Sequence, residues 1–151
     1  MARGFHFRLE RLLDLRRAKE EAAQRALAEA RRAVEEESRR LAGLLAEEEE
    51  GRRMSRGLRQ GALDLGALRL QESYQSAVDR RIRASRERLL ELGKAELEKR
   101  KALTEAMKAV KVLERVREKR LAEWTRAQDL EERKFLDEVA LGSEARAREG
   151  A

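Results

Sequence analysis

The 151-residue chain contains no proline and no asparagine, and Ile82 is its only isoleucine. Proline breaks helices and asparagine favours turns, so long helices can run through this chain without interruption. Ala, Leu, Arg, Glu and Lys make up 108 of the 151 residues, which is typical of long helices and coiled coils. Aromatic residues make up only 3%, too few for the core of a compact helical globule. The composition therefore predicts an all-α protein that buries a narrow seam between helices.

Glycine marks the expected organisation, because four of the nine glycines fall between residues 51 and 66. This cluster predicts the one turn of the chain. We expect a single domain over residues 1–151, with a first helix at about 5–53 and a turn region at about 54–66. A second helix is expected at about 67–141, followed by a frayed tail at 142–151. Gly43 and Gly93 lie within helical pattern and would allow close approach of another helix.

Apolar residues recur at heptad spacing in both expected helices, which predicts a long antiparallel two-helix coiled coil. The first helix carries two series of seam positions: Leu13, Glu20, Leu27, Val34 and Leu41, and Leu9, Arg16, Ala23, Ala30, Glu37 and Leu44. The second carries Val78, Ile82, Leu89, Leu92, Leu103, Ala106, Val110 and Leu113, and then drifts by one residue through Val116, Leu121 and Trp124. Such a drift is typical of a long, weakly supercoiled pair.

The net charge of +6 is unevenly distributed along the chain. Residues 1–19 carry a net charge of +4, residues 80–120 carry +8, and residues 121–151 carry −3. In an antiparallel hairpin whose ends meet, we expect the basic start to lie beside the acidic finish.

The residue inventory argues against an enzyme. There is no cysteine and one histidine, so cysteine-rich zinc sites and disulfides are excluded, and we expect neither metal nor cofactor. The pair Gly61 and Gly66 has the spacing of a phosphate loop, but Ala67 and Leu68 replace its lysine and hydroxyl residue. No apolar run approaches the 18 residues of a membrane span, and the start lacks the pattern of a secretory signal. These features favour a cytosolic protein.

The basic stretch raises the question of nucleic acid. Arg80, Arg81, Arg83, Arg86 and Arg88 could follow a row of phosphates. No aromatic residues are interleaved for base stacking, and interspersed glutamates weaken the field. We therefore favour an acidic protein partner over nucleic acid, and we regard adsorption to a membrane surface as still less favoured.

Two places hold aromatic residues where a plain coiled coil has no need of them. At the start, helical spacing would put Phe5 on one face with Leu9, Leu12 and Leu13, and would leave Phe7 off that face. These aromatics could pack on Trp124, Phe135 or Leu136 of the returning helix, or could enter a partner. Further along, Tyr74 could be an exposed anchor of the kind that interfaces favour.

Three short motifs resemble those of the flagellar FliJ family, a small coiled-coil component of the type III export apparatus. They are Phe5-x-Phe-Arg-Leu-Glu-x-Leu-Leu-x-Leu-Arg, Leu113-Glu-x-Val-x-Glu-Lys and Lys134-x-x-Asp137-Glu138-x-Ala140. The resemblance implies an antiparallel coiled coil similar to the rotary stalk of F-type ATPases. It also implies three partners: a hexameric export ATPase, the cytoplasmic domain of the export gate, and export chaperones.

Carried over by position, the resemblance implies two binding surfaces. The ATPase-facing surface would comprise Phe5, Arg8, Leu9, Arg11, Leu12, Asp137 and Glu138, and the gate-facing surface Leu44, Tyr74 and Val78. The chain departs from some members of the family at Glu47 and Gly51, where aromatics can occur, and at Arg81, where a small residue can occur.

The resemblance places the protein on the cytoplasmic side of the inner membrane, associated peripherally through the export apparatus and without direct insertion. Three alternatives stay open at this point. One is the equivalent stalk protein of an injectisome, and another is a basic coiled coil that binds nucleic acid. The third is a generic scaffold whose coiled coil serves only homo-oligomerisation.

Overall fold

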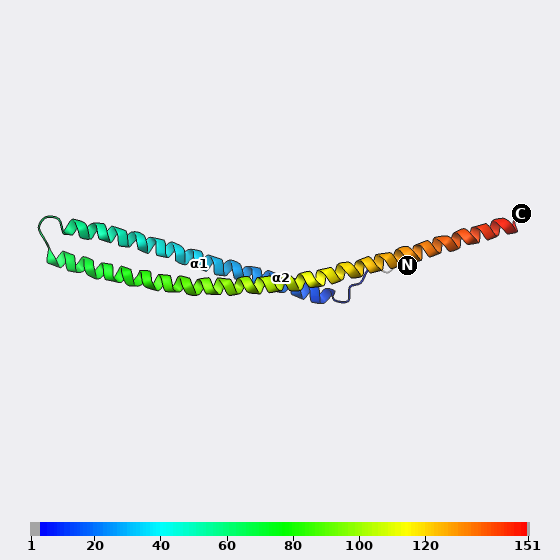
Figure 1. The fold of residues 1–151 in the computed structure, drawn as a ribbon, viewed down its shortest axis with the longest axis horizontal. Helices are drawn as coiled ribbons and strands as arrows, with labels where there is room; N and C mark the ends of the chain where they lie inside the picture. Colours follow the sequence, from blue (N-terminus) through cyan, green and yellow to red (C-terminus); the bar gives the residue numbers. More distant parts are fainter. Residues whose placement is uncertain (1–3, 151) are drawn as a thin grey trace. The chain divides into compact units, whose positions relative to one another are not determined.

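The computed structural model describes residues 4–150, which form two long helices and, within that range, no strand (Figure 1). Helix α1 spans Glu10–Leu58 and helix α2 spans Leu65–Glu149, with 49 and 85 residues respectively. Side chains of α2 contact α1 in antiparallel order, since Ser85 meets Glu37 while Gln71 meets Gly51. The predicted all-α helical hairpin is confirmed.

Contacts divide the chain into two compact units. The first, Glu20–Glu105, contains the connection between the helices and is called the loop unit below. The second combines Met1–Lys19 with Ala106–Ala151 and is called the terminal unit. Each unit pairs one stretch of α1 with one stretch of α2, and both are described separately. The expected single-domain organisation stays a prediction.

The connection between the helices is shorter than the glycine cluster suggested. Helix α1 continues through Gly51 and Gly57 to Leu58, and Gly61 follows with a φ of 82°, a left-handed conformation that glycine adopts without strain. Asp64 then caps α2, because its carboxylate accepts hydrogen bonds from the backbone N–H groups of Gly66 at 3.0 Å and Ala67 at 3.2 Å. The turn therefore occupies residues 59–64 instead of 54–66.

The outer helix ends also differ from expectation. Helix α1 begins at Glu10 and not at residue 5, after a turn in which the Glu10 N–H donates to the Phe7 carbonyl at 3.2 Å. Helix α2 continues beyond Leu141 to Glu149, through the segment that was expected to be frayed. Alanine, glutamate and arginine are good helix formers, which explains the continuation through a segment without apolar periodicity.

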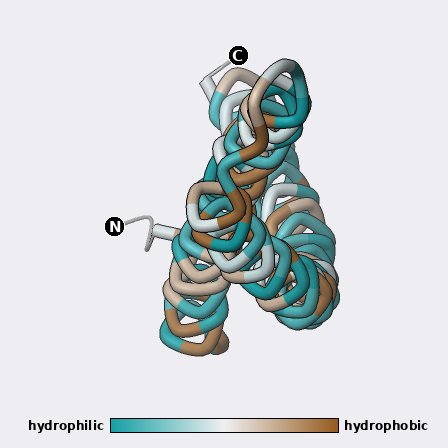
Figure 2. Tube along the Cα trace, turned by 90° about the vertical axis from the view of Figure 1, so that its left-hand side faces the viewer, coloured by the Kyte–Doolittle hydropathy of each residue, from teal (hydrophilic) through white to brown (hydrophobic). Residues whose placement is uncertain are grey.

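In the loop unit the predicted seam lies between the helices. Leu27, Val78 and Ile82 are buried, and Ala23, Ala30, Val34, Leu41, Leu44, Leu89, Leu92 and Leu103 are half-buried. Hydrophilic residues make up much of both helices, as the teal segments of Figure 2 show. Most of the predicted positions are thus confirmed as packing positions.

In the terminal unit the core is built from Phe7, Leu13 and Val110, of which Leu13 is fully buried. Phe7 was expected off the apolar face, and this expectation is wrong. Residues 4–9 precede the helix, so helical spacing does not apply to them. Leu9, a predicted seam position, is 38% exposed for the same reason.

Candidate partner-binding surfaces

The terminal unit holds an aromatic and cationic cluster before the start of α1. The ring of Phe5 lies 6.1 Å from the ring of Trp124, between centroids, and the guanidinium of Arg117 lies 5.7 Å from the centroid of Phe5. Such aromatic and cation–π contacts each add about 0.5–1 kcal/mol at partly exposed sites. Phe5 therefore packs on the returning helix, which confirms one of the two possibilities for this aromatic.

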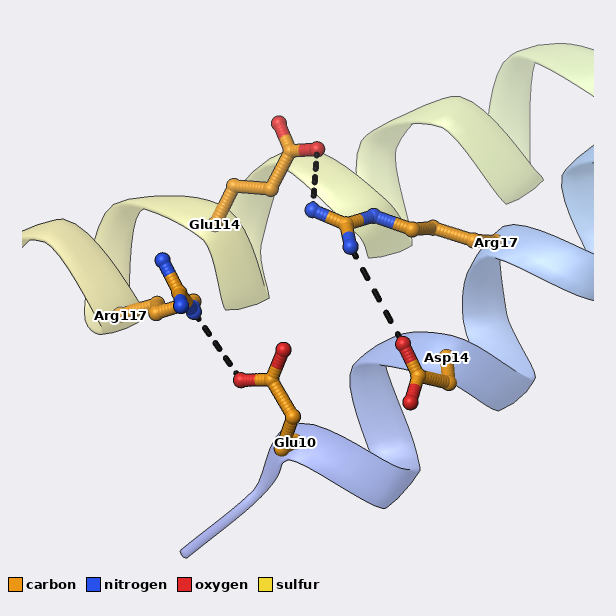
Figure 3. Close-up of polar contacts among 5 residues, drawn as sticks. All are labelled: Glu10, Asp14, Arg17, Glu114 and Arg117. Carbon is orange, nitrogen blue, oxygen red and sulfur yellow. Dashed lines mark hydrogen bonds and ion pairs between the residues drawn. The ribbon is translucent and has the colours of Figure 1, made fainter. Parts of the chain in front are cut away.

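Ion pairs fix the same region (Figure 3). The Nε of Arg117 donates to the carboxylate of Glu10 at 3.0 Å. The guanidinium of Arg17 lies 4.0 Å from the carboxylate of Asp14 and 3.5 Å from that of Glu114. The basic start thus contacts residues 114–124. The expectation that it lies beside the acidic stretch 121–151 is wrong except at its first residues, because the pairing register places Phe5 at Trp124.

A groove of about 620 Å³ opens beside this cluster. Its lining comprises Phe5, His6, Phe7, Arg8, Leu9, Val116, Arg120, Glu123 and Trp124. Leu9 in this lining and Leu12 outside it are 38% and 37% exposed. Arg8 in the lining and Arg11 outside it have no ion pair among the described residues. Exposed apolar side chains together with arginine are common in partner-binding surfaces.

Asp137 and Glu138 lie further along α2. At 1.5 Å per residue, Asp137 is about 20 Å past Trp124, and none of the contacts described for residues 4–150 joins either acid to the start of the chain. The surface inferred by position is thus split into two parts. The apolar residues of this stretch, Leu130, Phe135, Leu136, Val139 and Leu141, are exposed. Packing of the N-terminal aromatics on Phe135 or Leu136 is therefore excluded.

The loop unit holds a second candidate surface around Tyr74, which is 45% exposed. A groove of about 870 Å³ beside it is lined by Gly43, Ala46, Glu47, Glu50, Gly51, Met54, Leu70, Gln71, Ser73 and Tyr74. Met54 and Leu70 are also well exposed. The groove is thus largely apolar, with two carboxylates on its α1 side.

The other two residues inferred for the gate-facing surface lie differently. Val78 is fully buried between the helices and is unable to contact a partner while the hairpin is closed. Leu44 is half-buried and lines a smaller cavity of about 520 Å³ together with Arg81, Ser85 and Arg88. Tyr74 is therefore the residue of this set that is best placed for contact.

The seam of the loop unit contains polar contacts that the sequence did not predict. The buried carboxylate of Glu37 accepts a hydrogen bond of 2.7 Å from Ser85, and lies 3.8 Å from the guanidinium groups of Arg40 and Arg88. Gln71 donates to the carbonyl of Gly51 at 3.2 Å. The interruption of the heptad pattern by Glu37 was the only signal of these polar layers.

A third polar contact lies next to Gly51. Gln75 donates to the carbonyl of Glu48 at 3.3 Å, and a Cβ at Gly51 would lie 2.5 Å from the amide oxygen of Gln75. The missing side chain at Gly51 thus leaves room for the amide of Gln75.

Residues 4–150 contain no group of three or more His, Asp or Glu side chains that could hold a metal ion. Within the same range, no helix is both long enough and apolar enough to cross a membrane.

Comparison with known proteins gives one match. The family model described as "Flagellar FliJ protein" matches residues 5–149, nearly the whole chain. No curated protein and no solved structure matches it.

Proposed function

We propose a function from the premise that this chain belongs to the flagellar FliJ family. The protein is accordingly a non-enzymatic coiled-coil component of the flagellar type III protein export apparatus. Membership of this family favours a flagellar role over a role in an injectisome and over binding of nucleic acid. Within that apparatus, we propose that the terminal unit docks on the hexameric export ATPase.

The observation that carries this proposal is the pair of free arginines beside exposed leucines. Arg8 and Arg11 have no ion pair among the described residues, whereas the nearby Arg17 and Arg117 are each paired across the helices. Uncompensated cations next to Leu9 and Leu12 offer both charge and apolar contact to a partner. Phe5 has a different role, because its packing on Trp124 holds the segment that presents these residues.

Binding to the ATPase does not by itself couple ATP hydrolysis to the export gate. A stalk biases a ring of ATPase subunits only when it binds their nucleotide states with different free energies. We propose that Arg8 and Arg11 make contacts that differ between these states. Asp137 and Glu138 would extend the contact further along α2.

The experiment measures stimulation of ATP hydrolysis by the purified export ATPase in the presence of this protein. We expect an Arg8→Ala and Arg11→Ala double variant to lose most of the stimulation while retaining its helicity. An Arg25→Ala and Arg32→Ala double variant is the matched control, because these arginines are also exposed on α1 and unpaired among the described residues. Equal stimulation by both double variants would rule out the proposed contact.

The groove at Tyr74 is our proposed site for the cytoplasmic domain of the export gate. Its support is the exposed aromatic ring beside Met54 and Leu70, since tyrosine is enriched in the energetically dominant part of interfaces. Export chaperones are further partners that the family relationship suggests. Through these contacts the protein would associate peripherally with the cytoplasmic face of the inner membrane.

The gate proposal is tested by binding of the isolated gate domain to the full chain. We expect Tyr74→Ala to weaken the complex about tenfold or more, as for other central aromatic residues. Leu130→Ala removes a comparably exposed apolar side chain outside the groove and should leave the affinity unchanged. Unaltered binding by Tyr74→Ala would exclude this groove as the gate site.

A further inference from the structure

Helix α2 carries a second series of residues at heptad spacing in the loop unit. Arg83, Leu90 and Leu97 follow one another at intervals of one heptad, and Arg86 and Gly93 lie between them. The alternating spacing of three and four residues is the pattern of a coiled-coil seam. We call these five residues the outer ladder.

The outer ladder is distinct from the seam that packs on α1. Its first four members follow the seam residues Ile82, Ser85, Leu89 and Leu92 by one position, and Leu97 follows the half-buried Glu96. This offset turns the ladder by about 100° around the helix relative to the seam. The burial pattern agrees, since Ile82 and Ser85 are buried while Leu90 and Leu97 are 67% and 48% exposed. The ladder therefore faces away from the pairing with α1 and is free to pack on something else.

The middle of the ladder is suited to a third helix. Leu90 and Leu97 present apolar side chains one heptad apart, as knobs-into-holes packing requires. Between them, a Cβ on Gly93 would have no heavy atom within 4 Å apart from those of its chain neighbours and of the backbone of its own helix. A small residue between two leucines lets a partner helix approach the backbone closely.

The arginines at one end of the ladder are exposed and positively charged. Arg83 and Arg86 are exposed and have no ion pair among the described residues, although Asp79 and Glu87 are near in sequence. Some exposed basic residues of the loop unit form pairs with acids four positions away, as Arg39, Arg52 and Arg100 do, whereas others, such as Arg25, do not. The positive charge at this end of the ladder is therefore available to a partner.

From these observations we propose that the outer ladder binds an amphipathic helix of an acidic protein partner. The partner's apolar residues pack around Leu90, Gly93 and Leu97, and its carboxylates meet Arg83 and Arg86. The surface shares no residue with the two surfaces proposed for the ATPase and the gate.

A protein helix fits this surface better than a nucleic acid does. The two exposed leucines offer nothing to a phosphate backbone, which interacts with proteins through its charge. A helix, in contrast, places acids only where the arginines are and apolar side chains where the leucines are.

The test uses the full chain and a labelled synthetic helical peptide. The peptide carries two leucines one heptad apart, with glutamate pairs at both ends, so that either orientation brings acids to Arg83 and Arg86. We expect saturable binding to the wild-type protein and binding that is about tenfold weaker or worse for Leu90→Ser with Leu97→Ser. Arg25→Glu with Arg32→Glu is the control for net charge, and it should bind as the wild type does.

A charge exchange identifies direct contact. The variant Arg83→Glu with Arg86→Glu should no longer bind the glutamate peptide. It should instead bind a version of this peptide with lysine in place of glutamate, which the wild type does not bind. The substituted side chains are exposed, and circular dichroism verifies that helicity is retained.

Three results would overturn the proposal. One is an equal loss of peptide binding in the arginine variant and in the charge control. Another is binding of duplex DNA that depends on Arg83 and Arg86 but not on Leu90 and Leu97, which would make nucleic acid the partner. The third is self-association in sedimentation that disappears when both leucines are replaced, which would make a second copy of the chain the occupant.

Discussion

In the terminal unit, a non-helical segment packs its aromatics against α2, and Phe7, Leu13 and Val110 form an apolar core. In the loop unit, by contrast, apolar residues alternate with polar layers such as Glu37 with Ser85. Apolar packing gives stability but specifies the register between the helices only weakly. After a shift by one heptad, one leucine takes the place of another. Buried polar groups penalise a shifted register because they lose their partners. The contrast suggests that the terminal unit gains stability from packing while the loop unit also determines register.

The residue numbers of the polar pairs support this division. The pairs Glu37 with Ser85, Gly51 with Gln71, and Glu48 with Gln75 belong to nearly the same antiparallel register. A shift of one heptad would bring the Glu37 carboxylate opposite Leu92 or Val78, where it would have no hydrogen-bond donor.

The largest effect is expected at the core of the terminal unit. Leu13 is fully buried, so Leu13→Ala should lower the free energy of unfolding by about 2–5 kcal/mol, measured by urea denaturation. Leu15→Ala is the control, because Leu15 is 54% exposed and its truncation should cost much less. Similar losses for both variants would contradict the assignment of Leu13 to the core.

The next effect tests the polar layer of the loop unit. Ser85→Ala removes the hydroxyl that donates to the buried Glu37 carboxylate, and should cost about 1–3 kcal/mol in the same measurement. The control is Ser38→Ala, since the Ser38 hydroxyl is exposed and bonds only to the carbonyl of Val34. If both serines proved equally dispensable, the polar layer would not contribute to the stability of this unit.

A smaller effect separates two helical glycines of the loop unit. Gly43→Ala should raise the free energy of unfolding by about 1 kcal/mol, because alanine favours the helix and no neighbour lies within 4 Å of the new Cβ. Gly51→Ala should raise the free energy of unfolding by less than this or not at all, since the new methyl group displaces Gln75 from its hydrogen bond to Glu48. Thermal unfolding of the two variants provides the comparison, and an equal gain would refute the close fit at Gly51.

The smallest effect concerns the ion pairs of the terminal unit. Arg117 is about 40% exposed and contacts both Glu10 and Phe5, so Arg117→Ala should cost about 0.5–1 kcal/mol at low salt. Arg115→Ala, an exposed neighbour without an ion pair among the described residues, should be nearly neutral. Added salt should reduce the difference in free energy of unfolding between the two variants. A difference that does not change with salt would indicate packing as its cause instead of charge.

Periodicity was sufficient to predict the helical hairpin and most of its seam, since the positions from Leu13 to Leu44 repeat over many turns. It failed at Phe7 because that residue precedes the helix, where no helical spacing applies. It also gave no indication that Gly51, which lies within the expected first helix, leaves room for Gln75. The partners of Glu37 depend on the register between helices, and a single sequence contains no direct record of that register.

The stretch of α2 after Trp124 remains helical to Glu149 while its leucines, Phe135 and Val139 stay exposed. A helix without a packed face is held mainly by its own backbone hydrogen bonds, which are marginal in water. Its amide hydrogens should therefore exchange with deuterium far faster than those around Val110, although both belong to one continuous helix. A bound partner would slow this exchange where it makes contact, so deuterium uptake along α2 can map its footprint without any substitution.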